Sequence, residues 1–244
     1  MTIQAVSGER SKRRSTRRHK HPWLRRVARV LLFLAAIVLL SIVVFRFVNP
    51  PATPVMLVER LTGHTLRHDW VPLEDISPQL PVAVIASEDG RFCVHWGVDW
   101  GAVREAVKEG GGLKAVRGAS TIPMQTAKNL YLWNGRSYVR KALEVPLAYI
   151  MTALWPKQRM MEVYLNVAQF GPGIFGAEAA SRYYFRKSAA DLTRREAVLL
   201  AAALPNPRFR NAAKPSRRML IVAKAVERRM PIMMQRSGCV IPAQ

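Results

Sequence analysis

The chain has 244 residues, half of them hydrophobic, which is enough for one main domain with a sizeable buried core. Its 38 Lys and Arg against 16 Asp and Glu give a formal net charge of +22, which favours anionic partners: nucleic acid, anionic lipid or a phosphate-bearing substrate. Two cysteines, Cys93 and Cys239, are too few for a disulfide framework. The sequence does not show whether they meet, and Cys93 is more simply a small buried hydrophobic residue.

Residues 1–26 form a basic segment. It carries nine Lys or Arg residues and a single acid, Glu9. Such a run is usually disordered. A nucleic-acid-binding arm is conceivable, but the hydrophobic segment that follows favours a cytoplasmic tail.

Residues 27–48 predict a transmembrane helix. No charge occurs between Arg29 and Arg46, and the 22 residues approach the roughly 20 that a bilayer core needs. A signal peptide is the alternative, but the apolar run is long and no convincing small-x-small cleavage site follows it. The basic tail places the N-terminus in the cytoplasm. We therefore expect a single-pass protein of the cell inner (cytoplasmic) membrane with a periplasmic, extracytoplasmic domain.

We interpret residues 49–80 as a linker and membrane-proximal segment, in which Met56–Leu61 is a candidate strand. Val82–Ser87 predicts a buried helix with Pro81 in its first turn. Further helices are expected at 100–108, 122–132, 138–154, 156–168, 178–185, 197–204 and 216–229. Strand signals are sparse, so the domain, placed at 81–230 before a C-terminal tail at 231–244, should be mainly α. The glycines at 110–112 predict a hinge or mobile loop.

The helix expected at 138–154 carries a candidate core stripe. Its members are Val139, Leu143, Leu147, Ile150 and Leu154. Pro146 should kink or break this helix. Glu144 follows Arg140 by four residues and Lys141 by three, so both cations share its face. Taken alone, these three residues are more simply an exposed ion-pair cluster.

Two clusters of polar residues and one acid outside them indicate a catalytic site. In residues 84–97 an apolar run ends in Glu88 and Asp89, and residues 118–125 supply hydroxyl and amide groups. An acid at a helix C-terminus opposes the macrodipole, so a raised pKa of Glu88 is expected, which suits a general base. The outlier is Glu144. Two carboxylates in unlike settings, with cations between them, suit transfer chemistry on a sugar that carries phosphate.

These blocks resemble the signature motifs of the peptidoglycan glycosyltransferases, glycosyltransferase family 51, which also form a domain of class A penicillin-binding proteins. The first motif, Glu-Asp-x-x-Phe-x-x-His-x-Gly, matches Glu88, Asp89, Phe92, His95 and Gly97. The second, Gly-x-Ser-Thr-Ile-x-x-Gln, matches Gly118, Ser120, Thr121, Ile122 and Gln125. The third, Arg-Lys-x-x-Glu, matches Arg140, Lys141 and Glu144. Further matches are Tyr164-Leu165-Asn166 and Glu196-Ala197 with Pro205.

The resemblance implies a lysozyme-like, two-lobed fold and polymerisation of lipid II, the undecaprenyl-diphosphate-linked disaccharide-pentapeptide, by inverting transfer. Glu88 would be the base on the acceptor 4-hydroxyl, with Asp89 in support. Glu144 would act at the diphosphate, either by orienting cations or by holding a divalent metal such as Mg²⁺. No organic cofactor is expected. The remaining substrate-contact positions are Ser120, Thr121, Gln125, Lys128, Arg136, Arg140 and Lys141.

The sequence departs from the family pattern at Met124, where a second glutamine is common. One hydrogen-bonding group is lost there, so donor contacts are expected to be weaker or rearranged, although the acids and cations remain. The penicillin-binding Ser-x-x-Lys pattern is missing, so a monofunctional enzyme is expected. His95 is more simply structural, and Glu196 has the spacing of a helix cap.

Two other functions stay open. A lysozyme-type hydrolase also uses two carboxylates, although the cations around Glu144 suit a diphosphate leaving group better. The other is a catalytically weak, membrane-anchored scaffold of the cell wall machinery. A non-enzymatic, membrane-anchored binder of nucleic acid or anionic lipid would explain the charge and nothing else. The expected partners are lipid II, the nascent glycan strand, the membrane, and transpeptidases with divisome or elongation proteins; nucleic acid is not expected.

Overall fold

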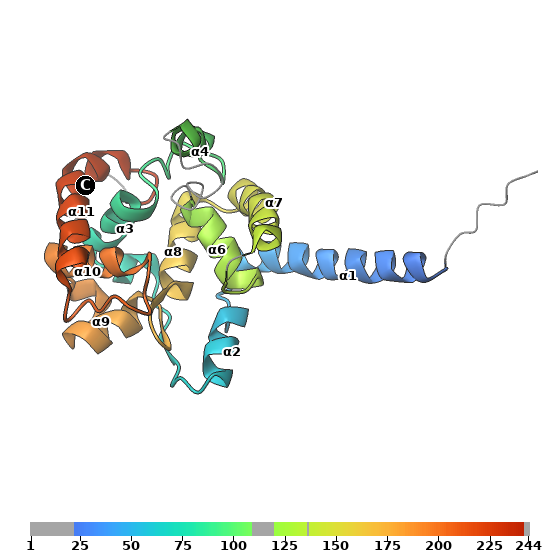
Figure 1. Cartoon of the computed structure of the whole chain (residues 1–244), viewed down its shortest axis with the longest axis horizontal. Coiled ribbons are helices and arrows are strands. Elements are labelled where there is room, and N and C mark those ends of the chain that lie inside the picture. The colour runs from blue at the N-terminus through green and yellow to red at the C-terminus, as the bar shows by residue number, and fades with distance from the viewer. Residues whose placement is uncertain (1–21, 109–119, 136, 242–244) are drawn as a thin grey trace, which may run out of the picture. The chain divides into compact units, whose positions relative to one another are not determined.

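The computed structural model describes residues 22–108, 120–135 and 137–241 (Figure 1). Four sequence-based expectations therefore lie wholly or largely outside the described residues: the basic tail, the glycine loop at 110–112, the motif residue Gly118, and the candidate contact Arg136. The chain divides into two compact units, Met1–Leu40 and Ser41–Gln244. Most of the predicted helices fall in the second unit.

The first described element is the apolar helix α1, Pro22–Phe45. Its 24 residues and its apolar composition make it the one helix, within the described ranges, that is long and apolar enough to cross a membrane. The prediction of such a helix is confirmed, although the helix lies slightly earlier in the chain than 27–48. The finding is compatible with membrane anchoring.

The last turn of α1 belongs to the second unit. Trp155 donates from its indole nitrogen to the carbonyl of Ile42 at 2.8 Å. Arg159 donates to the carbonyls of Phe45, at 3.0 Å, and Val48, at 2.9 Å. Residues 41–48 are thus hydrogen-bonded into the domain that follows them.

Helix α2, Pro54–Leu61, occupies the segment for which a strand was predicted, and that prediction is wrong. Thr53 caps the helix by accepting a hydrogen bond from the Met56 amide at 3.2 Å, and Pro54 suits the first turn because its ring fixes φ. Short apolar runs do not distinguish strand from helix by periodicity. In this segment, the Thr53 cap and Pro54 favour the helix over a strand.

The rest of the domain is mainly helical, as predicted. Its helices are α3 Gln79–Glu88, α4 Trp100–Ala106, α6 Ile122–Tyr131, α7 Tyr138–Leu154, α8 Lys157–Val167, α9 Ala177–Phe185, α10 Arg194–Ala203 and α11 Arg217–Arg236. Among the described residues, the 3₁₀ turns Leu73–Asp75 and Ala189–Asp191 lie between helices of the domain. Helix α11 runs past Pro231 and ends seven residues later than expected.

A three-stranded sheet completes the domain. Its strands are β1 Arg67–His68, β2 Gln169–Gly171 and β3 Ile174–Phe175, in the order β1-β3-β2. Strand β3 pairs parallel with β1 and antiparallel with β2, so it ties the segment after α2 to the hairpin after α8. Gly173 takes φ of 69° in the hairpin turn, a conformation that favours glycine.

The core is built around α3. All residues from Leu80 to Ala86 are buried, and the helix packs against α10 and α11, as Figure 1 shows. Helix α6 packs against α7 and α8. Because α3 is buried along its length, the acids at its C-terminal end emerge from a rigid element.

The stripe predicted for α7 is wrong. Val139 and Leu143 are 67% and 43% exposed. The buried residues of α7 are instead Glu144, Ala148 and Met151. Pro146 lies inside the helix, which continues to Leu154 without a break. A sequence pattern assigns the apolar face to the core, but contact with α6 buries the face that carries the carboxylate.

Cys93 and Cys239 form a disulfide with a Cα–Cα separation of 5.7 Å. The expectation that Cys93 is only a small buried hydrophobic residue is therefore wrong. The bond joins the loop after α3 to the segment after α11, 146 residues apart in sequence. Folding brings the two cysteines together, and nothing in their spacing indicated it.

Candidate active site

Glu88 is the last residue of α3, and its carboxylate is held from two sides. Ser87 donates from its hydroxyl to Oε1 at 2.9 Å. Gln125, on α6, donates from its amide nitrogen to Oε2 at 3.0 Å. The two helices thus fix the carboxylate in one place.

Burial raises the pKa of Glu88 above its ordinary value. The hydrogen bonds from Gln125 and Ser87, and the positive charges of Arg210 and Lys128, act in the opposite direction but do not outweigh burial. The predicted direction of the pKa shift is confirmed. Its main cause is desolvation, whereas the sequence argument invoked the helix macrodipole.

Asp89 belongs to a different hydrogen-bond network. His95 Nε2 lies 2.9 Å from both of its carboxylate oxygens, and the Ile122 amide donates to Oδ2 at 2.9 Å. Asp89 therefore connects the loop after α3 to the first turn of α6. Any support that it gives to Glu88 acts through the placement of α6, which carries Gln125. His95 takes the structural place expected for it.

Two hydroxyls of the second motif are engaged at the start of α6. Thr121 is the N-cap residue; its Oγ1 accepts from the Met124 amide at 3.4 Å and donates to the Gly97 carbonyl at 2.5 Å. Ser120 accepts a hydrogen bond from Lys141 Nζ at 2.5 Å. Thr121 thus has a structural task, whereas Ser120 joins the cation cluster on α7.

Glu144 is 2% exposed, and both of its oxygens face cations. Arg140 forms an ion pair with Oε1, and Lys141 Nζ lies 3.1 Å from Oε2. The interpretation as an exposed ion-pair cluster is wrong, because the acid is buried. In the part of the chain that the structure describes, the buried Arg140 Nε has no hydrogen-bond partner. It is a donor available to an anionic group.

Lys128 lies on α6, the helix that also carries Gln125. It is electrostatically coupled to Glu88 and to Arg140. Burial, followed by the positive charge of Arg140, lowers the pKa of Lys128 to about 8. The same two causes, with Lys128 in addition, lower the pKa of Lys141 to about 8. Lys128, Arg140 and Lys141 are therefore partly dehydrated cations that act on one another, and the last two pair with Glu144.

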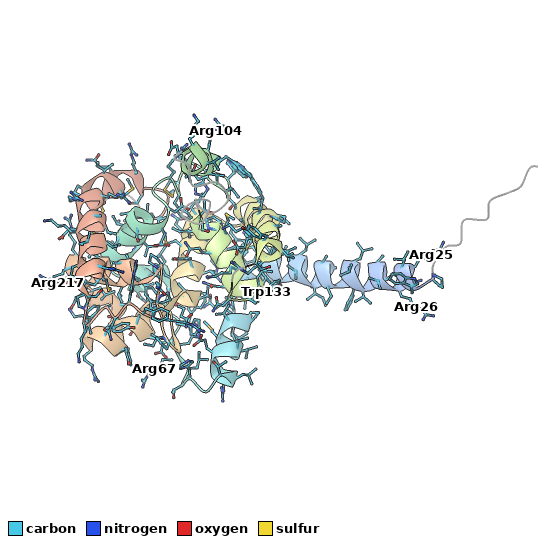
Figure 2. The ribbon with its side chains drawn as sticks, in the orientation of Figure 1. Arg25, Arg26, Arg67, Arg104, Trp133 and Arg217 are labelled. Atoms are coloured by element: carbon cyan, nitrogen blue, oxygen red, sulfur yellow. A yellow bond between two sulfur atoms is a disulfide. The ribbon has the colours of Figure 1, made fainter. Side chains whose placement is uncertain are left out.

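These site cations differ from the other basic residues of the domain. Arg67 on β1, Arg104 on α4 and Arg217 on α11 are exposed on separate elements (Figure 2). The large positive charge is thus spread over the surface, while the cations near Glu144 are concentrated and partly buried. Cations whose pKa values are shifted by burial and by neighbouring charges are found preferentially at functional sites, so this cluster is a candidate binding site for an anionic group.

Sequence reasoning missed three residues that contact the site. Tyr164 is buried, and its hydroxyl donates to Gln125 Oε1 at 3.1 Å. Lys157 donates to the carbonyls of Phe92, at 2.6 Å, and His95, at 2.8 Å. Arg210 acts on Glu88 through its charge. Only Tyr164 carried a signal, its place in a motif block.

Met124 faces away from this polar region. It is 2% exposed and packs in an apolar cluster with Val98 and Ala148. The residue that departs from the family pattern therefore fills the core. Glu196, in contrast, forms the expected capping box with Thr193.

The side chains do not by themselves form a metal site. Within the described ranges, no three His, Cys, Asp or Glu side chains are grouped so that they could hold an ion. Both oxygens of Glu144 are already engaged by Arg140 and Lys141. A divalent ion such as Mg²⁺ would need most of its oxygen ligands from elsewhere, and we assign no step to one.

Comparison with known proteins agrees with the geometry. Residues 55–236 match the family model described as Transglycosylase. The chain is 49% identical to the biosynthetic peptidoglycan transglycosylase of Agrobacterium fabrum over 219 residues, covering 89% of this chain and 96% of that protein. Proteins of the same name from Rhodospirillum centenum and Pasteurella multocida are 50% and 45% identical, and each alignment covers 86% of this chain. These cover 91% and 88% of the respective relatives.

Proposed function

The chain belongs to the transglycosylase family and has its lysozyme-like glycosyltransferase fold, and on this premise we propose that it polymerises lipid II into glycan strands for the cell wall. The observation that carries the proposal is the pairing of two unlike carboxylates across one cationic region. Glu88 is partly buried with a raised pKa, and Glu144 is buried between cations. Lys128 interacts electrostatically with Glu88 and with Arg140, the partner of Glu144.

Glu88 is the general base. Its raised pKa brings the carboxylate closer to neutral working pH, where a base is most effective. It removes the proton from the 4-hydroxyl of the acceptor sugar as that oxygen attacks the anomeric carbon of the donor. The bond from this carbon to the diphosphate oxygen breaks, the electron pair leaves with undecaprenyl diphosphate, and the anomeric configuration inverts.

The cations on α6 and α7 stabilise the leaving group. Negative charge develops on the diphosphate as the bond breaks, and Arg140, Lys141 and Lys128 lie together to meet it. Glu144 holds Arg140 and Lys141 in place, while Ser120 orients the Lys141 ammonium group. A hydrolase acting on a neutral glycan would have no use for this cluster.

The remaining proposals concern the location of the enzyme in the cell and the proteins with which it works. We propose that α1 anchors the enzyme in the inner membrane with the N-terminus in the cytoplasm, because the basic residues precede the apolar helix. The domain then lies on the periplasmic side, where lipid II presents its sugars. Transpeptidases and divisome or elongation proteins are proposed as partners, since a glycan strand must be cross-linked after it is made.

The test is polymerisation of labelled lipid II by the detergent-solubilised full-length protein. Glu88→Gln keeps the size of the side chain but cannot accept the proton, so its polymerisation rate should fall by about 100-fold or more. Glu196→Gln is the matched control, because that acid forms the capping box and an ion pair with Lys187 rather than part of the proposed site, and it should retain activity.

Three outcomes are informative. Long glycan from the wild type and the control, with none from Glu88→Gln, supports both the transferase and its base. Release of fragments from purified peptidoglycan, without polymer, would favour a hydrolase. No activity from folded, membrane-inserted wild type would favour a scaffold.

A further inference from the structure

We propose that Tyr164 is a positioning residue that holds the amide of Gln125 so that its NH₂ group faces the Glu88 carboxylate. The inference rests on the proposed function, in which Glu88 is the base. It adds a residue that does not touch substrate but acts through Gln125. Three helices contribute to this arrangement: α8 carries Tyr164, α6 carries Gln125 and α3 ends at Glu88.

The contacts form a series of hydrogen bonds that has a fixed donor-to-acceptor direction. The Tyr164 hydroxyl donates to Gln125 Oε1 at 3.1 Å, and the Nε2 group of the same amide donates to Glu88 Oε2 at 3.0 Å. Tyr164 is fully buried, with 0% exposure, so water does not compete for its hydroxyl. Packing of α8 against α6 fixes the distance between the tyrosine and the amide.

This direction is fixed because the side-chain amide has an acceptor oxygen at one end and a donor NH₂ group at the other. If the Gln125 amide rotated by half a turn, its oxygen would face the ionised carboxylate, and the two acceptors would repel each other. The tyrosine would then accept from the NH₂ group, and its own proton would lose the acceptor that it now has. Within the described residues, Gln125 is the one recorded hydrogen-bond partner of this hydroxyl.

The orientation matters for the charge on Glu88. Burial raises the pKa of this acid, and the hydrogen bond from Gln125 is the largest influence that lowers it again. Without that bond the pKa rises further, and a smaller fraction of the enzyme carries an ionised base at neutral pH. Activity on the acid side of the pH profile should therefore depend on Tyr164.

Other charged groups face Glu88 and remain in place when Tyr164 changes. Lys128 lies on α6, Arg210 follows α10, and both lower the pKa of Glu88. Arg229 on α11 donates to the Ala86 carbonyl at 3.4 Å, within the last turns of α3. Burial and the charges of Glu88 and Asp89 raise the pKa of Tyr164 itself far above neutrality, so its hydroxyl keeps its proton.

The experiment compares the pH dependence of polymerisation in the full-length protein with that of Tyr164→Phe. Phenylalanine keeps the ring and its packing but removes the donor. The acid limb of the profile should move upward by about 0.5 to 1 pH unit, with activity recovering at higher pH. Tyr184→Phe is the matched control, because its hydroxyl also donates at 3.1 Å, but to the Phe170 carbonyl; its acid limb should not move.

A second variant tests the route of the effect. Gln125→Leu should shift the acid limb by itself, and adding Tyr164→Phe to it should cause no further shift, because the tyrosine acts only through the amide. An unshifted limb in Tyr164→Phe, with activity lowered equally at all pH values, would show that Tyr164 only packs and would overturn the inference.

The inference about Tyr164 can be tested even if the proposed function is wrong. If the wild type makes no polymer, the ionisation of Glu88 can still be followed by NMR of ¹³C-labelled glutamate carboxyls, with the signal assigned by its loss in Glu88→Gln. The inference then expects a higher titration midpoint in Tyr164→Phe than in the wild type. Equal midpoints would overturn it.

Discussion

Lys141 Nζ lies 3.1 Å from the buried carboxylate of Glu144 and also donates to Ser120. Helical spacing alone brings Lys141 beside Glu144, but burial changes what the pair does. A buried acid holds its cations firmly, since leaving them unpaired in a dehydrated site is costly. Glu144 therefore allows Arg140 and Lys141 to remain close together despite their mutual repulsion.

Removing the charge of Glu144 should affect both stability and activity. In Glu144→Gln, Arg140 and Lys141 lose their counter-ion, and the free energy of unfolding should fall by about 3–5 kcal/mol. Polymerisation should fall on the order of 100-fold, because the cations no longer meet the leaving group in a fixed arrangement. Thermal unfolding and initial polymerisation rates measure the two effects. Glu227→Gln, an exposed change on α11, is the control. Full activity in a destabilised Glu144→Gln protein would limit Glu144 to a structural role.

The two lysines of the site predict an alkaline limit to activity. Each has a pKa of about 8, so each loses its positive charge as the pH rises through that value. Rates should therefore fall above about pH 8. Lys141→Arg keeps its charge to much higher pH and should move this limb upward. Polymerisation rates measured from neutral to alkaline pH test the prediction, with Lys224→Arg on α11 as the control. The prediction is wrong if the alkaline limbs of the wild type, Lys141→Arg and Lys224→Arg coincide.

The same lowered pKa values have a consequence for stability. Between about pH 8 and the ordinary lysine value of 10.5, the unfolded chain binds more protons than the folded protein does. The contribution of these lysines to the free energy of unfolding therefore rises with pH across that interval. Below about pH 8 the folded protein bears the full cost of their buried charge.

The disulfide should stabilise the domain. Cys93→Ser should lower the free energy of unfolding by about 2–5 kcal/mol, because the unfolded chain loses a long closed loop. Cys239→Ser should have a similar effect, and the double variant should not be markedly worse than either single variant, since one bond is lost in each. Thermal unfolding with and without reductant measures the change. An identical melting temperature for wild type under both conditions would contradict the prediction.

Restoring the family's glutamine at position 124 should harm the protein. Met124 is buried against Val98 and Ala148, so Met124→Gln places an amide among apolar side chains and should cost about 1–3 kcal/mol. Met124→Leu, which conserves volume and polarity, should cost less than about 1.5 kcal/mol. Chemical denaturation of both variants tests the difference. A gain in both stability and rate in Met124→Gln would show instead that the missing amide belongs in the donor site.

Several features could be predicted from the sequence because they are local. The apolar helix before the domain, the helices at 122–132 and 138–154, and the capping box of Glu196 all follow from spacing within a few residues. The order of the motif blocks indicated the family, which the comparisons confirmed. The sequence also placed Arg140, Lys141 and Glu144 on one face, since helical geometry dictates it.

The features that folding alone decides all join residues distant in sequence. The stripe predicted on α7 failed because an apolar pattern does not say which neighbour a helix face will meet. The disulfide and the Tyr164–Gln125–Glu88 chain depend on separations of 146, 39 and 37 residues. The sequence by itself thus determined the family, most of the helices and the residues capable of chemistry. Only the tertiary structure decided which of them are buried and paired, because burial and long-range hydrogen bonds arise when helices pack and exclude water.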